Sequence, residues 1–157
     1  MLNQPDLTEQ QWPFSCPSIG ELGWQEISDP MDFLLIQESQ DHFWQNVIRE
    51  ALVTIGQLQV VGEDASISRI VSGSYDLVIV DASSVENGAL LVARIRAQMP
   101  RLRVIVASIA PSWREVREMF HAGAIDCIDK SFDKIELLTA VRSALATDIG
   151  KKKQMEM

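Results

Sequence analysis

Short apolar runs rich in β-branched residues alternate with stretches of helical period from residue 32 onward, and this alternation limits the fold more than any other feature of the chain. The runs that predict strands are 33–36, 58–61, 77–80, 104–107 and 124–128. Each is short and bounded by polar or turn-forming residues. Because runs such as 77–80 are apolar throughout instead of alternating with polar residues, we expect strands that are buried on both faces, as in a parallel sheet.

The stretches between these runs predict helices. The first has the clearest apolar stripe, at Trp44, Val47, Ile48, Ala51, Leu52 and Ile55. Later stretches repeat the pattern less regularly, with Leu91, Ile95 and Met99, then Trp113, Val116 and Phe120, then Leu138, Val141 and Leu145. We expect Trp44 and Trp113 to pack in the core. The stretch around 67–71 is short, but two parallel strands need a crossover, which is usually helical. The sequence therefore predicts an α/β fold, a (βα)5 unit with a doubly wound parallel sheet.

The front of the chain has a different character. Residues 1–48 hold eight acids and no Lys or Arg, and four prolines within the first 31 residues oppose any long helix or strand. We expect an acidic N-terminal extension over 1–31, one globular domain over 32–147 and a polar tail over 148–157. The large aromatic residues of the extension, Trp12, Phe14 and Trp24, are expected to pack on its own domain, with a partner surface as the alternative.

Charge and composition exclude several classes of protein. The net charge of -8 disfavours direct nucleic-acid binding, because an acidic surface repels phosphate. No apolar run approaches the roughly 20 residues that span a bilayer, and no secretory signal is evident, so we expect a cytoplasmic protein without membrane contact. The two cysteines, Cys16 and Cys127, lack metal-site spacing and are expected to be reduced.

Polar residues follow four of the predicted strands, at the edge where open parallel sheets place their functional sites. They are 37–39 after the first strand, Asp81 after the third, Ser108 after the fourth and Lys130 after the fifth. A Mg²⁺ ion prefers carboxylate oxygens, which Glu38 and Asp81 would supply. Asp81 could then attack phosphorus as a nucleophile, while Lys130 offsets the added charge and Ser108 binds the new oxygens.

The residues of these strands resemble response-regulator receiver domains over 32–146. Residues 75–81, Tyr-Asp-Leu-Val-Ile-Val-Asp, look like the strand that ends in the phosphoacceptor, and 104–108 look like the strand that ends in the switch hydroxyl. The most specific match is 122–132, whose Ala-Gly-Ala leads to Lys130 as in the family. The resemblance implies a flavodoxin-like sheet of order 2-1-3-4-5, a signalling module that is not an enzyme, and a metal site formed by Glu38, Asp81 and the backbone near Ser83.

The chain also departs from the family's pattern. Gln37 replaces the first of two acids that usually follow the first strand, and the loop after Asp81 lacks the common Met-Pro pair. Cys127 stands at the aromatic switch position, and Ser131 replaces the proline that follows the lysine. A cis peptide is therefore not expected between Lys130 and Ser131, because a non-proline cis bond costs about 2.5 to 4 kcal/mol.

Two functions remain open at this point. The first is a phosphoacceptor receiver that takes a phosphoryl group from a histidine kinase or phosphotransfer protein. Only eleven residues follow Ala146, so we expect it to signal through contacts with a downstream protein partner. The alternative is a pseudo-receiver that binds partners without phosphorylation, in which Asp81 is a helix cap or loop acid and Lys130 forms a structural ion pair. A flavin enzyme is disfavoured, because the acidic loop 38–41 would repel phosphate.

Overall fold

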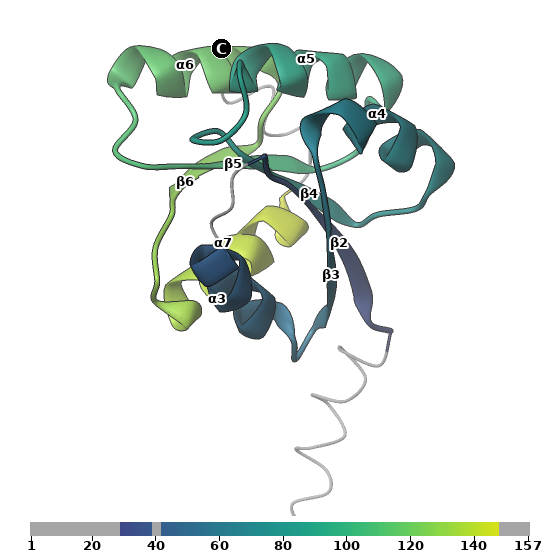
Figure 1. The fold of residues 1–157 in the computed structure, drawn as a ribbon, viewed down its shortest axis with the longest axis vertical. Coiled ribbons are helices and arrows are strands. Elements are labelled where there is room, and N and C mark those ends of the chain that lie inside the picture. The colour runs from purple at the N-terminus through teal and green to yellow at the C-terminus, as the bar shows by residue number, and fades with distance from the viewer. Residues whose placement is uncertain (1–28, 39–41, 148–157) are drawn as a thin grey trace, which may run out of the picture. The chain divides into compact units, whose positions relative to one another are not determined.

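The computed structural model describes residues 29–38 and 42–147, and within them five strands alternate with five helices (Figure 1). The predicted polar tail lies outside the described residues, and so does the predicted N-terminal extension apart from residues 29–31, of which Met31 begins the first strand. The strands are β2 (Met31–Ile36), β3 (Gly56–Val61), β4 (Leu77–Asp81), β5 (Val104–Ser108) and β6 (Asp126–Asp129). The helices are α3 (His42–Leu52), α4 (Glu63–Ser72), α5 (Gly88–Gln98), α6 (Trp113–Ala122) and α7 (Lys134–Ala146).

The strands form one parallel sheet in the order β3-β2-β4-β5-β6. Numbered from the first described strand, this is the order 2-1-3-4-5, so the predicted doubly wound, flavodoxin-like fold is confirmed. All five predicted strands are present. β6 begins two residues later than the apolar pattern indicated, although the Ile125 amide already donates to the Val104 carbonyl at 2.8 Å.

Side chains of the central strands alternate between two apolar layers, as the period of a strand requires. Phe33 and Leu35 pack with α3 and α7 on one face, whereas Leu34 and Ile36 pack with α4, α5 and α6 on the other. Figure 1 shows these two groups of helices on opposite sides of the sheet. The whole of β4 is buried, which fits its uninterrupted apolar sequence. In β4, the only polar side chain, Asp81, therefore stands at the end of the strand.

Local signals set the helix ends near the site. The Ser112 hydroxyl accepts the Glu115 amide at 3.1 Å, and the Glu115 carboxylate accepts the Ser112 amide at 2.9 Å, which together form a capping box that starts α6. Gly123 ends the same helix with φ of 122°, a conformation that side-chain-bearing residues rarely adopt. The helix is thus fixed at both ends between β5 and β6.

The apolar stripe predicted for α3 is confirmed, whereas the one predicted for the start of α6 is wrong. Trp44, Val47, Ile48, Ala51 and Leu52 are all buried in α3. Trp113, expected in the core, is instead 74% exposed, and Met119 is the buried residue of α6. Six residues correspond to about 600° of helical rotation, so Trp113 lies about 120° around the helix from Met119 and faces away from the sheet.

No helix in the described part of the chain is both long and apolar enough to cross a membrane.

Candidate functional site

The polar residues predicted at the strand ends meet at the carboxyl edge of the sheet. Asp81 is the last residue of β4, Ser108 the last of β5, and Lys130 directly follows β6. Asp81 is opposite Ala107 in the neighbouring strand, so Ser108 lies one residue beyond it. The Lys130 amide donates to the Ser108 carbonyl at 3.0 Å, which fixes the lysine relative to β5.

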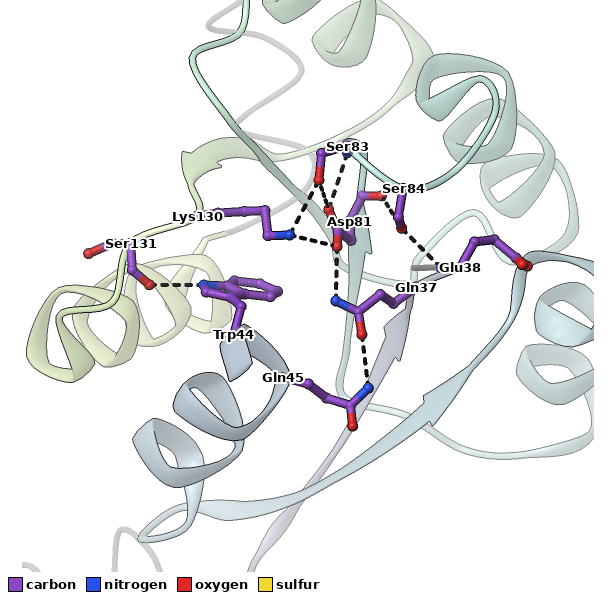
Figure 2. A network of polar contacts seen from close by, with 9 residues as sticks. All are labelled: Gln37, Glu38, Trp44, Gln45, Asp81, Ser83, Ser84, Lys130 and Ser131. Atoms are coloured by element: carbon purple, nitrogen blue, oxygen red, sulfur yellow. Dashed lines mark hydrogen bonds and ion pairs between the residues drawn. The ribbon is translucent and has the colours of Figure 1, made fainter. Parts of the chain in front are cut away.

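The Asp81 carboxylate is fully buried and accepts hydrogen bonds on both oxygens (Figure 2). Its Oδ1 accepts from the Ser83 hydroxyl at 2.6 Å and from the Ser83 amide at 3.1 Å. Its Oδ2 accepts from Lys130 Nζ and from Gln37 Nε2, each at 3.0 Å. A buried carboxylate needs such partners, because burying an unpaired charge is strongly unfavourable.

Lys130 is held from both sides. Its side chain is only 5% exposed, and Nζ also lies 3.3 Å from the Ser83 hydroxyl. The same nitrogen lies 4.9 Å from the centre of the Trp44 ring, a distance that permits a cation–π interaction. The Trp44 indole N–H donates to the Ser131 carbonyl at 2.9 Å, so the tryptophan anchors the segment that carries the lysine. The described residues contain no cis peptide, as expected for Lys130–Ser131.

Gln37 replaces one of the acids expected after β2, and its amide is part of the site. The side chain is 5% exposed. Its Oε1 accepts from Gln45 Nε2 of α3 at 2.8 Å, while its own Nε2 faces Asp81. An ionised carboxylate only accepts hydrogen bonds, so the amide must present its NH₂ group to Asp81, and the contact with Gln45 agrees with that orientation.

Glu38 lies next to this network but its side chain points away from it, toward α4 (Figure 2). The Glu38 carboxylate accepts the Glu63 amide at the start of α4, a favourable place for a negative charge. Gly62 leaves the room for it, because a Cβ there would lie 2.9 Å from Glu38 Oε2. The Glu38 amide donates to the Ser84 hydroxyl at 2.9 Å, and that hydroxyl donates to the Asp81 carbonyl at 3.1 Å.

The sequence and structure of this site match one known family. The family model for the response regulator receiver domain matches residues 39–142, which is most of the chain. The chain belongs to this family. Receiver domains are signalling modules, not enzymes, and they act with histidine kinases in two-component signal transduction.

Relatives and solved structures agree with this assignment. The chain is 35% identical over 105 residues to the DNA-binding transcriptional regulator NtrC of Bradyrhizobium sp., a match that covers 65% of this chain and 22% of that protein. The chain thus spans about a quarter or less of the length of the curated relatives it matches. A response regulator from Thermotoga maritima superposes with a TM-score of 0.65 and 26% identity, covering 76% of this chain and all of the other. An orphan response regulator of H. pylori gives a TM-score of 0.65 and 25% identity, covering 73% and 96%.

Receiver domains typically bind Mg²⁺, but the donors of this site do not fit such a cation as they are arranged. Gln37 presents N–H groups, both oxygens of Asp81 accept hydrogen bonds, and the Glu38 carboxylate is engaged at α4. Within residues 29–38 and 42–147, no three His, Cys, Asp or Glu side chains are grouped so that they could hold a metal ion. The Mg²⁺ roles of Glu38, Asp81 and Ser83 stay predictions.

Sequence reasoning identified Asp81, Lys130 and Ser108 as neighbours at one edge, and the structure brings them there. It missed the roles of Gln37 as a donor, of Trp44 beside Lys130, and of Ser84 between the two loops. Of these three residues, only Gln37 stood out in the sequence, because it is a polar residue that directly follows an apolar strand. The Trp44 contact had no signal, because the residue also completes the apolar stripe of α3.

Proposed function

We propose that Asp81 is the phosphoacceptor of a two-component phosphorelay, taking its phosphoryl group from a histidine kinase or phosphotransfer protein. The observation that carries the proposal is the buried pair of Asp81 and Lys130, with Nζ 3.0 Å from Oδ2. A lysine in that place offsets the charge of the carboxylate and of anything attached to it. The position of Ser108, one residue beyond the partner of Asp81 in β5, gives a hydroxyl at the same strand edge.

The chemistry requires one carboxylate oxygen to form a bond to phosphorus while the bond between phosphorus and the donor atom breaks. To free Oδ1 for this bond, the Ser83 hydroxyl would have to rotate away from it, while Gln37 and Lys130 donate to the other oxygen, Oδ2. Phosphorylation adds about -1.5 to -2 charge, and Lys130 with the hydroxyls of Ser108 and Ser83 would bind the new oxygens.

The signal would then leave through protein contacts on the face formed by β5, β6 and their helices. The part of this face that follows β5 exposes two large apolar side chains, Ile109 at 66% and Trp113 at 74%. Both residues belong to the segment that follows Ser108, and a contiguous exposed apolar surface favours a protein partner. The capping box at Ser112 connects this surface to Ser108 through a loop of three residues, 109–111.

The test is treatment of the full chain with acetyl phosphate and MgCl₂, followed by intact mass spectrometry. A single phosphoryl adduct is expected on the wild type and on Asp129→Asn, a matched control at the exposed end of β6, but not on Asp81→Asn. Beryllofluoride should shift NMR signals of Asp81 and of residues in the β5–α6 loop. An adduct that persists in Asp81→Asn, or one absent from the wild type, would refute the proposal.

A second candidate is a pseudo-receiver that binds partners without phosphorylation. It is favoured by the four hydrogen bonds that already satisfy both oxygens of Asp81. It predicts no adduct and no beryllofluoride shifts under conditions that label an ordinary receiver. The same experiment therefore separates the two candidates.

A further inference from the structure

Gln37 contacts the Asp81 carboxylate directly, so the side chain at position 37 affects the charge of the site. It directly follows β2 and is buried, and its Nε2 lies 3.0 Å from Asp81 Oδ2. Of the described groups that donate to the Asp81 carboxylate, only Lys130 is charged. Asp81 and Lys130 form a buried pair of opposite charges, and the neutral amide adds no charge to it. An acid at position 37 would instead place two carboxylates against one ammonium group.

The amide is held in a fixed orientation by its own partner. Gln45 Nε2 donates to Gln37 Oε1 at 2.8 Å, so the amide oxygen is engaged by α3 and the amide nitrogen faces Asp81 (Figure 2). A divalent cation binds oxygen atoms and is repelled by N–H groups. A cation that approached Asp81 from the side of Gln37 would therefore meet the NH₂ group of the amide instead of its oxygen.

Protein hydrogen bonds also join the two loops that a cation would otherwise bridge. The Ser84 hydroxyl connects the Glu38 amide, at 2.9 Å, with the Asp81 carbonyl, at 3.1 Å. The Glu38 carboxylate is at the start of α4, where the Glu63 amide donates to it. The loops after β2 and β4 are thus connected to each other without a metal ion.

From these contacts we infer that Gln37 takes the place of a divalent cation beside Asp81, so that the folded site is complete without Mg²⁺ and binds it weakly. The inference concerns the same site as the proposed function. Its test measures cation binding and unfolding, and phosphorylation plays no part in it, so either proposal can fail while the other stands.

The decisive variant is Gln37→Glu in the full chain, because glutamate has the size of glutamine and exchanges only the NH₂ group for oxygen. Thermal unfolding is measured in EDTA and in excess MgCl₂. The melting temperature of the wild type should be the same in both. Gln37→Glu should melt lower than the wild type in EDTA, because two buried carboxylates repel, and should recover in MgCl₂. Its affinity for Mg²⁺ should exceed that of the wild type at least about tenfold, since cation affinity follows the number of charged ligands.

Gln98→Glu is the matched control, since it makes the same chemical change at an exposed position at the end of α5. Its melting temperature should not respond to MgCl₂. For the wild type alone, a ¹⁵N NMR titration should leave the side-chain amide signals of Gln37 unchanged as MgCl₂ is added, a measurement that does not depend on whether the variant folds. A wild type that gains as much stability from MgCl₂ as Gln37→Glu, or Gln37 signals that shift at low Mg²⁺ concentration, would overturn the inference.

Discussion

Replacing Lys130 by methionine tests how far the stability of the domain depends on the buried ion pair. Removing one partner of such a pair costs about 3 to 5 kcal/mol, because the other charge stays buried. The loss here should be near the lower limit, since Asp81 retains the Gln37 amide and both donors of Ser83. Methionine keeps much of the aliphatic stem of the lysine but loses the cation–π contact with Trp44, which is worth about 0.5 to 2 kcal/mol. We expect a total loss of about 4 kcal/mol, which corresponds to a decrease in melting temperature of roughly 12 to 20 °C for a domain of this size.

Urea unfolding at neutral pH measures this loss, and Lys134→Met provides the control. Lys134 pairs with Glu50, but both side chains are more than half exposed, so its removal should change stability by less than about 1 kcal/mol. In a double-mutant cycle, Asp81→Asn combined with Lys130→Met should lose at least about 1 kcal/mol less than the sum of the single losses. Equal effects at Lys130 and Lys134, or single losses that simply add, would show that the ion pair is not the coupled buried pair described above.

Two further predictions concern residues beside the site. Trp44→Phe should lower the free energy of unfolding in urea by about 2 kcal/mol, because it removes the indole N–H hydrogen bond to the Ser131 carbonyl and leaves space in the core. The control Trp113→Phe, on the exposed side of α6, should change it by no more than about 0.5 kcal/mol. Similar losses for the two variants would contradict the buried position of Trp44. Burial, and then the negative charges of nearby acids, raise the pKa of the Cys127 thiol, so iodoacetamide should label it more slowly in the folded chain than in the urea-unfolded chain at the same pH. The raised pKa stabilises the fold below the pKa of the unfolded thiol, and this contribution is lost as pH rises through the folded value; equal labelling rates in the two states would contradict this.

The sequence was informative wherever apolar periodicity decides the structure. β4 is apolar from Leu77 to Val80 and is buried in full, and the crossover rule supplied α4, although its apolar stripe is short. The error at Trp113 has a different origin. The seven residues from Trp113 to Phe120 return to nearly the same side of the helix, but the side that packs on the sheet is centred nearer Met119. Neither Val116 nor Phe120, which completed that stripe, is fully buried, and Met119 carries the contact instead.

The direction of polar side chains at strand ends could not be predicted, because it depends on groups that are distant in sequence. Glu38 was expected beside Asp81, yet its carboxylate lies at the start of α4, where the Glu63 amide is available and Gly62 leaves room. Gln37 and Gln45 are eight residues apart with no pattern that pairs them, and the α3 backbone brings them together. The elements follow from periodicity, whereas the hydrogen bonds of the site follow from how the elements pack.

The hydrogen bonds around Asp81 also determine how the domain could respond to phosphorylation. In the resting site, the donors of Gln37, Ser83 and Lys130 all serve one carboxylate. A phosphoryl group on Asp81 would add charge without adding a cation, so these donors would have to turn toward the new oxygens. The Ser84 hydroxyl, in the loop after β4, accepts a hydrogen bond from the Glu38 amide, and the Lys130 amide donates one to the Ser108 carbonyl of β5. A change of hydrogen-bond partners at Asp81 would therefore shift the loops on both sides of it. Ser84→Ala removes the hydrogen bond between the loop after β4 and the Glu38 amide. This variant should show smaller beryllofluoride-induced NMR shifts around Glu38, while the shifts around Ser108 persist.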